Sequence, residues 1–133
     1  METTPVLLLL EDERALRQLL SQALADHGFR VHAAESLESG KRLIDRVGWQ
    51  TIDVVLTDVN LSRDPAVRDG MAFYHHWRAR HPVPPFIFLS GLGEFAFPPG
   101  AAPAQSWADP AYHLAKPFQF STLVTLIHFI LAD

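Results

Sequence analysis

The sequence has no cysteine, so it can form neither a disulfide bond nor a thiolate metal site. It also has no excess of basic residues, because the formal net charge is -4 and the pI is about 5.9. Sequence-independent binding to a phosphate backbone needs a basic face, so we expect no direct contact with nucleic acid. Long apolar runs are missing as well: the first one, residues 6–10, is far shorter than the roughly 20 residues of a membrane span. These absences favour a cytoplasmic protein that does not contact a membrane.

The 133 residues, 48% of them apolar, suffice for one compact domain, which we assign to residues 1–133. Short apolar runs that suit buried strands alternate with segments in which apolar residues recur at helical spacing. The predicted strands are residues 5–10, 29–33, 51–59, 84–90 and 112–115. The first predicted helix carries Leu16, Leu19, Leu20, Ala23 and Leu24 and ends before Gly28. The second is a segment with Leu37, Leu43, Ile44 and Val47 on one side. The third spans residues 70–81, and the last spans residues 118–131.

Residues 91–110 interrupt this alternation. Seven of the ten prolines lie between residues 82 and 110, which excludes a regular helix through most of that segment. We expect no more than a single helical turn, near residues 105–108. The rest of the pattern predicts an α/β fold, with a parallel sheet that helices cover on both faces.

Polar residues end four of the predicted strands. They are Glu11 and Asp12 after the first strand, Asp58 at the third, Ser90 at the fourth and Lys116 after the fifth. Ligands of open parallel sheets bind at the carboxyl ends of the strands, so we expect these side chains to share one site. Three carboxylates in one site need a cation, and Mg2+ commonly binds one or two carboxylates together with substrate phosphate oxygens.

The same residues suit phosphoryl transfer, in which positioning and charge neutralisation supply most of the catalysis. Lys116 would add a second positive charge beside Asp58, and the Ser90 hydroxyl would donate to a phosphoryl oxygen. Asp58 would then be a nucleophile that forms an acyl phosphate.

The chain resembles the receiver (response-regulator, CheY-like) domain of two-component signalling. The resemblance rests on five motifs in order: "VLLLLEDE", "VVLTDVNL", "DGMAFYHHWRARHP", "FIFLSG" and "YHLAKPF". It implies a flavodoxin-like, doubly wound, five-stranded parallel sheet in a single domain, here with the fourth helix short or absent.

By this resemblance, Asp58 is the phosphoacceptor, and its donor is a histidine kinase or a phosphotransfer protein. Asp12 binds Mg2+ directly, Glu11 does so directly or through water, and the backbone carbonyl of Asn60 supplies another ligand. Ser90 and Lys116 contact the phosphoryl group, and the bond before Pro117 is cis. The resemblance further implies self-phosphorylation and auto-dephosphorylation, with no turnover of an independent substrate.

Two departures from the family pattern bear on output. At the switch position, where the family usually has Tyr or Phe, the chain has His113, which we interpret either as a polar switch or as an ordinary partly buried histidine. Tyr112 cannot replace it, because neighbours on a strand point to opposite faces. The loop after Asp58 is longer than usual by about four residues. Its Arg63 and Arg68 either meet an acidic donor, shield the phosphoryl group, or belong to a solvated loop with balanced charges.

A second hypothesis is a degenerate receiver that acts as a phosphorylation-independent protein-interaction module. A third, a phosphatase of the haloacid dehalogenase type, needs a second acid two residues after the nucleophile, where this chain has Asn60. Met1 and the end after the last helix favour a stand-alone regulator, and a homodimer is compatible with this interpretation.

Overall fold

A computed structural model describes residues 4–59, 61, 69–90 and 111–132. In this part of the chain five strands form one parallel sheet in the order β2-β1-β3-β4-β5. The strands are β1 (Val6–Leu10), β2 (Arg30–Ala34), β3 (Val54–Asp58), β4 (Phe86–Ser90) and β5 (Ala111–Ala115). The order reverses between β1 and β3, which makes the sheet doubly wound, as predicted.

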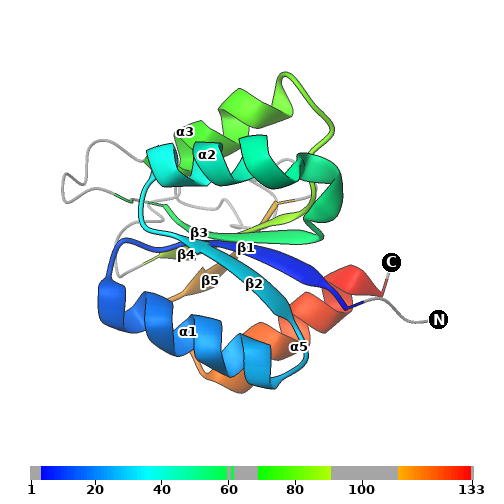
Figure 1. Ribbon diagram of the computed structural model, residues 1–133. Coiled ribbons are helices and arrows are strands. Elements are labelled where there is room, and N and C mark those ends of the chain that lie inside the picture. The colour runs from blue at the N-terminus through cyan, green and yellow to red at the C-terminus, as the bar shows by residue number, and fades with distance from the viewer. Residues whose placement is uncertain (1–3, 60, 62–68, 91–110, 133) are drawn as a thin grey trace, which may run out of the picture.

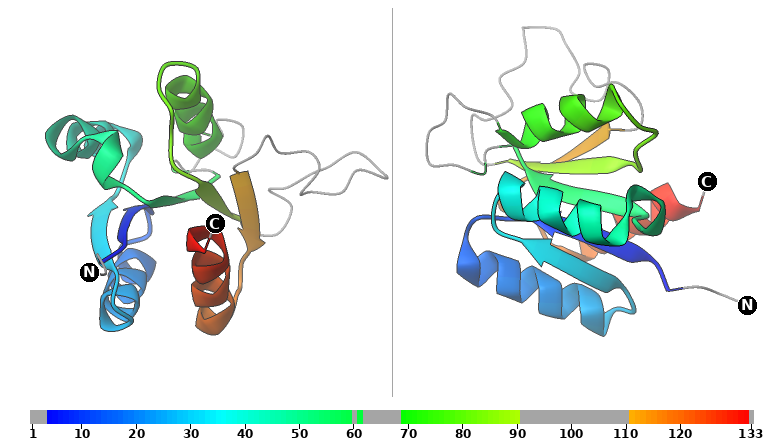
Figure 2. Two further views of the ribbon diagram at one scale, coloured as in Figure 1. Left: turned by 90° about the vertical axis from the view of Figure 1, so that its right-hand side faces the viewer. Right: turned by 45° about the horizontal axis from the view of Figure 1, so that its top comes forward.

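Helices cover both faces of the sheet. They are α1 (Arg14–Asp26), α2 (Leu37–Val47), α3 (Asp69–Arg78) and α5 (Phe120–Leu131). Figure 1 shows α2 and α3 above the sheet and α1 and α5 below it, and the end-on view in Figure 2 separates the same two layers. The predicted short or absent fourth helix falls on residues 91–110, which lie outside the described residues. No helix of the described ranges is long and apolar enough to cross a lipid bilayer.

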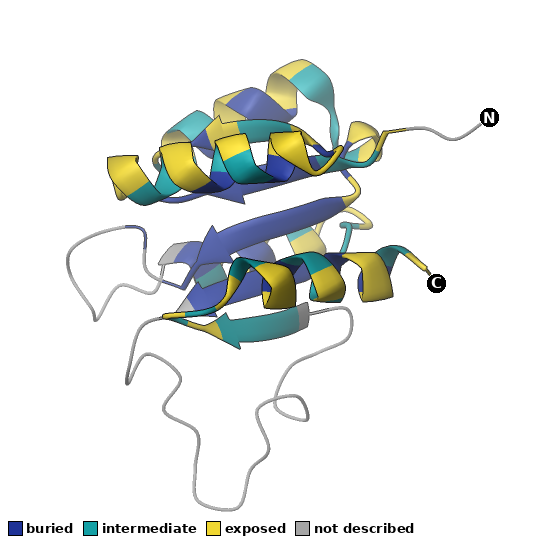
Figure 3. Cartoon of the chain, turned by 90° about the horizontal axis from the view of Figure 1, so that it is seen from below, coloured by how far each residue is buried: buried dark blue, intermediate teal, exposed yellow. Residues whose placement is uncertain are grey.

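The core consists of two clusters, one on each face of the sheet. Alternate residues of β1 supply both: Leu8 and Leu10 pack with α2 and α3, and Leu7 and Leu9 pack with α1 and α5. Figure 3 shows the central strands buried along their length, whereas buried and exposed residues alternate along the helices. This burial on both faces explains why β1 is a continuous apolar run in the sequence and why β3 begins as one.

The third strand begins later than predicted. Residues 49–51 form a short 3-10 helix, which includes Thr51, the first residue of the predicted strand. Gly48, with φ +82°, ends α2, and the Thr51 hydroxyl donates to the Gly48 carbonyl over 2.9 Å. This local turn competes successfully with strand pairing, so β3 starts at Val54.

The apolar stripe predicted for the first helix is wider than its contact with the sheet. Leu20 and Leu24 are buried, whereas Leu19 is 65% exposed. Helical spacing identifies the residues that share a side of a helix, but the neighbouring elements decide how much of that side is covered. The helix does end as predicted, before Gly28, which has φ +89°.

Candidate functional site

The strand register brings the predicted residues to one edge of the sheet. Leu10 of β1 pairs with Thr57 of β3, Asp58 pairs with Leu89 of β4, and Ser90 pairs with Ala115 of β5. Glu11 and Lys116 each follow the last paired residue of their strand. The carboxyl ends of four neighbouring strands therefore meet at one place, as the sequence predicted.

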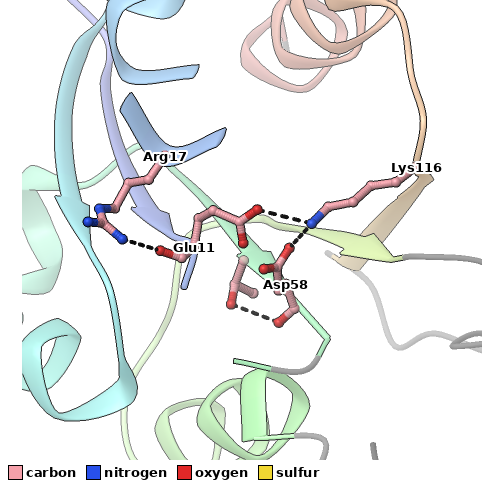
Figure 4. A network of polar contacts seen from close by, with 5 residues as sticks. Glu11, Arg17, Asp58 and Lys116 are labelled. Atoms are coloured by element: carbon pink, nitrogen blue, oxygen red, sulfur yellow. Dashed lines mark hydrogen bonds and ion pairs between the residues drawn. The ribbon is translucent and has the colours of Figure 1, made fainter. Parts of the chain in front are cut away.

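The Lys116 ammonium joins two acidic residues at this edge. Its Nζ lies 3.0 Å from Glu11 Oε1 and 2.7 Å from Asp58 Oδ1. Figure 4 shows the lysine reaching both carboxylates from the end of β5. The Glu11 side chain is fully buried and that of Asp58 is 5% exposed, whereas Lys116 is 26% exposed. Because buried carboxylates are stable only when paired, this ammonium stabilises both of them.

Three carboxylates converge closely enough to hold one metal ion. One oxygen each from Glu11, Asp12 and Asp58 lie within 4.8 Å of one another, and Asp12 is the exposed member. Glu11 Oε2 is buried and has no hydrogen-bond partner among the described residues. A buried carboxylate oxygen without a hydrogen bond costs free energy, and coordination of a cation would remove that cost.

The composition of this cluster fits a hard divalent cation. All three donors are carboxylate oxygens, the ligand type of Mg2+ and Ca2+. The formal charges of three carboxylates and one lysine leave two negative charges, which one divalent ion balances. The structure therefore brings Glu11, Asp12 and Asp58 together in a group that could hold a divalent ion.

Backbone contacts fix Asp58 at the end of β3. The buried Thr57 hydroxyl donates to the Asp58 carbonyl over 3.0 Å. Gly70, at the start of α3, donates its N–H to the Val59 carbonyl over 2.9 Å. A Cβ on Gly70 would collide with the carbonyl oxygen of Asp58, so only glycine allows this close approach. The motif at residues 69–70 thus places the first turn of α3 directly against the residue that bears the candidate nucleophile.

Sequence reasoning missed a further residue of the site, Arg17 of α1. Its Nη1 donates to the Glu11 carbonyl over 3.0 Å (Figure 4). Glu11 itself donates its N–H to the Ala34 carbonyl over 3.0 Å. A bond from a side chain to a carbonyl six residues earlier has no signature in apolar periodicity, so the sequence pattern gave no signal for it.

Some predicted site residues are described only in part. Ser90 ends β4 in register with Ala115, but its side chain lies outside the described part. Asn60, Arg63 and Arg68 also lie outside the described residues. The peptide bond between Lys116 and Pro117 is cis, as the resemblance implied.

His113, the residue at the switch position, lies on β5 in register with Phe88. Tyr112 packs against the cluster that includes α1 and α5, whereas Phe88 belongs to the cluster on the opposite face. Because His113 is in register with Phe88, His113 and Tyr112 point to opposite faces of the sheet, as strand alternation predicted. Partial burial of the His113 ring lowers its pKa below the ordinary value of 6.5, because burial disfavours the charged form.

The family model of the response regulator receiver domain matches residues 7–128. The match covers every described strand except the first residue of β1, and it includes the first nine of the twelve residues of α5. The chain therefore belongs to the response regulator receiver domain family of two-component systems.

Curated relatives are much longer than this chain. The chain is 33% identical over 121 residues to the sensor kinase CckA of Brucella abortus, covering 90% of this chain and 12% of that protein. It is 27% identical over 120 residues to the DNA-binding transcriptional regulator NtrC of Klebsiella pneumoniae, covering 90% of this chain and 23% of that protein. The similarity thus spans less than a quarter of either relative.

Solved structures confirm the CheY-like fold. A response regulator receiver protein from Sinorhizobium medicae superposes with a TM-score of 0.74 at 26% identity, covering 98% of this chain and 96% of that one. A CheY-like receiver domain from Methylobacillus flagellatus gives a TM-score of 0.73 at 21% identity, covering 96% of this chain and 99% of that one. The latter similarity supports the fold alone.

Proposed function

We propose that the chain is a phosphoacceptor switch in which Asp58 receives a phosphoryl group in the presence of Mg2+. The observation that carries this proposal is the arrangement around Asp58. Its carboxylate lies within a cluster of three acidic side chains, and the Lys116 ammonium lies 2.7 Å from its Oδ1. A nearly buried aspartate with a cation beside it is equipped to attack phosphorus, since the developing charge is balanced where it forms.

In this proposal the metal ligands are Glu11, Asp12, Asp58 and the backbone carbonyl of Asn60. A bound Mg2+ would supply positive charge to the oxygens of the transferred phosphoryl group. An oxygen of Asp58 attacks phosphorus while the bond from phosphorus to the donor breaks, which leaves an acyl phosphate on Asp58. Lys116 stays paired with the modified residue, and Ser90 donates its hydroxyl to a phosphoryl oxygen.

We infer that the donor is a histidine kinase or a phosphotransfer protein, and that phosphorylation changes protein–protein interactions of the chain. The family membership supports a two-component role. Sensor-kinase and DNA-binding activities belong to the longer relatives by name, so neither is assigned to this chain. His113 is the proposed switch residue on β5. Residues 1–133 as one domain, the cytoplasmic location and the homodimer stay predictions.

The alternative, a degenerate receiver that acts without phosphorylation, is not favoured. A chain that had lost phosphoryl chemistry would have no need to keep charged residues buried together, because buried charges are costly. Glu11, Asp58 and Lys116 are nevertheless in direct contact.

The test is intact-mass spectrometry after incubation with Mg2+ and acetyl phosphate. The chain should gain the mass of one phosphoryl group, and the Asp58→Asn variant should gain nothing. Chelation of Mg2+ should also abolish the gain, because the three carboxylates would then repel the donor. No mass gain with any small phosphodonor, in protein that is shown to be folded, would rule out the proposed acceptor.

A further inference from the structure

The turn between β1 and α1 carries three consecutive acidic residues but lacks the usual device that secures the start of a helix. Glu13 is the N-cap residue of α1, and its side chain makes no capping hydrogen bond. The first turn of α1 contains no acidic residue. Ser, Thr, Asp or Asn normally caps the first N–H groups of a helix, so the N-cap side chain does not fix the path of the chain into α1 here.

Arg17 supplies a hydrogen bond that ties the turn to the helix. Its partly buried Nη1 donates to the Glu11 carbonyl over 3.0 Å. The Glu11 N–H is held by Ala34 of β2, and its Oε1 by Lys116. Figure 4 shows Arg17 and Lys116 contacting Glu11 from opposite sides, one at the main chain and the other at the side chain.

The carbonyl that Arg17 contacts belongs to the peptide unit that links Glu11 to Asp12. A peptide unit is planar, so fixing its oxygen also fixes the N–H and the Cα of Asp12. Asp12 is the exposed member of the carboxylate cluster. The orientation of its side chain toward the other two carboxylates therefore depends on the backbone of the turn.

We propose that Arg17 is a positioning residue for the metal site, which holds the peptide between Glu11 and Asp12 so that both carboxylates face the same ion. This inference rests on the proposed function, because it assumes that the cluster binds Mg2+. Arg17 contacts the Glu11 carbonyl and would act on the ion through it. Loss of a residue that orients metal ligands commonly weakens metal binding by about 10- to 100-fold.

The charge of Arg17 and its proposed positioning role predict opposite effects on Mg2+ affinity when the residue is replaced. The Arg17 guanidinium is positive and close to the site, so its charge alone opposes the binding of a cation. If charge were its main contribution, removing it would strengthen Mg2+ binding. If position is its main contribution, removing it weakens Mg2+ binding although one repulsive charge has been lost.

The experiment is calorimetric titration of the full chain with MgCl2, using wild type, Arg17→Gln, Arg17→Lys and Arg14→Gln. Arg14 is the matched control, because it is an exposed arginine in the first turn of the same helix. We expect the Kd of Arg17→Gln to rise about tenfold. Arg17→Lys keeps the charge but replaces the planar guanidinium by an ammonium on a shorter side chain, so its Kd should be intermediate, whereas Arg14→Gln should bind Mg2+ as tightly as wild type or slightly more tightly.

Urea unfolding of all four proteins in EDTA shows whether a variant is generally destabilised or has lost only the orientation of its metal ligands. The positioning role is supported if a variant loses more free energy of Mg2+ binding than free energy of unfolding. If Arg17→Gln does not fold, Arg17→Lys decides, since an affinity equal to that of wild type would then contradict the proposal. Unchanged or tighter Mg2+ binding by folded Arg17→Gln, or equal weakening in Arg14→Gln, overturns the inference but leaves the proposed function intact. Absence of Mg2+ binding by wild type overturns both.

Discussion

The ammonium of Lys116 lies between two carboxylates that are almost fully buried, at 3.0 Å from Glu11 Oε1 and 2.7 Å from Asp58 Oδ1. Replacement by Met removes this charge and leaves the two acids facing each other. We expect Lys116→Met to lower the free energy of unfolding in EDTA by about 2 kcal/mol, the scale of hydrogen bonds to charged groups. Urea unfolding measures the change.

Mg2+ should restore much of the stability that Lys116→Met loses, because the ion supplies the missing positive charge to the same carboxylates. Lys41→Met, at an exposed lysine of α2, is the matched control and should change little under either condition. A deficit of the same size with and without Mg2+ would show that the lysine and the ion do not share their partners.

His113 predicts how stability depends on pH. Burial lowers its pKa below 6.5 in the folded protein, so the folded state binds fewer protons at this ring than the unfolded chain does. The stability that this residue contributes is fully present above pH 6.5 and is lost as the pH falls below that value. His113→Gln should therefore flatten the decline in the free energy of unfolding between pH 7.5 and about 5.5.

His32 accounts for part of the remaining slope. Burial, and then the nearby Arg46 and Arg30, lower its pKa in the same direction. Urea unfolding at several pH values should give a slope that decreases from wild type to His113→Gln and again in the double variant with His32→Gln. A slope that His113→Gln leaves unchanged would mean that this ring titrates alike in the folded and unfolded chains.

At the scale of elements, the contact between α3 and β3 depends on Gly70. A Cβ at residue 70 would meet the backbone oxygen of Asp58, which no side-chain rotation can relieve. At Gly40 of α2 a Cβ would meet the end of the Leu10 side chain at 2.7 Å, which can move. Gly70→Ala should therefore destabilise the fold by about 1–3 kcal/mol in urea unfolding. Gly40→Ala should cost clearly less, because the higher helix propensity of Ala offsets part of the strain.

The same substitution should disturb the site, because the Asp58 carbonyl and the Asp58 side chain belong to one residue. Phosphorylation of Gly70→Ala by acetyl phosphate should be slower than that of Gly40→Ala in samples that are equally folded. Equal stabilities and equal rates for the two variants would contradict the role that we assign to this close approach.

The elements show what the sequence could predict. Strand ends were predictable because strands buried on both faces are continuous apolar runs, and a parallel sheet collects its carboxyl ends at one edge. This reasoning brought together Glu11, Asp12, Asp58 and Lys116, as the structure does. The prediction was wrong at Thr51, the first residue of the predicted third strand, where the turn that Gly48 begins and the bond from the Thr51 hydroxyl replace strand pairing.

Other features of the site were beyond sequence patterns because they depend on tertiary distances. The approach of Gly70 to Asp58 and the bond from Arg17 to the Glu11 carbonyl join residues whose spacing has no period. The exposure of Leu19 likewise depends on what packs beside α1, not on the helix itself. Periodicity predicts the faces of elements, whereas the contacts that orient a site arise from how those faces meet.

At the scale of the whole molecule, the site joins strands from both halves of the sheet. Its carboxylates follow β1 and β3, and its lysine follows β5 at the sheet edge. A cation held there binds only the folded chain, so it should stabilise the entire domain. Mg2+ at about 100 times its Kd should raise the free energy of unfolding by about 2.7 kcal/mol.

Thermal unfolding with MgCl2 or with EDTA measures this coupling. Asp12→Asn is the informative variant, because Asp12 is exposed and its replacement should leave the metal-free fold nearly unchanged. The increase in Tm with Mg2+ should shrink or vanish in this variant. An undiminished increase would place the ion elsewhere on the chain.

The central claim, that Asp58 is the phosphoacceptor, is tested most directly by locating the modified residue. The protein is incubated with Mg2+ and acetyl phosphate, reduced with borohydride, digested and mapped by tandem mass spectrometry. Reduction converts an acyl phosphate of aspartate into homoserine, so the account predicts homoserine at residue 58 and at no other position. Homoserine at another aspartate, a phosphoryl group on a histidine, or no modification of residue 58 would contradict it.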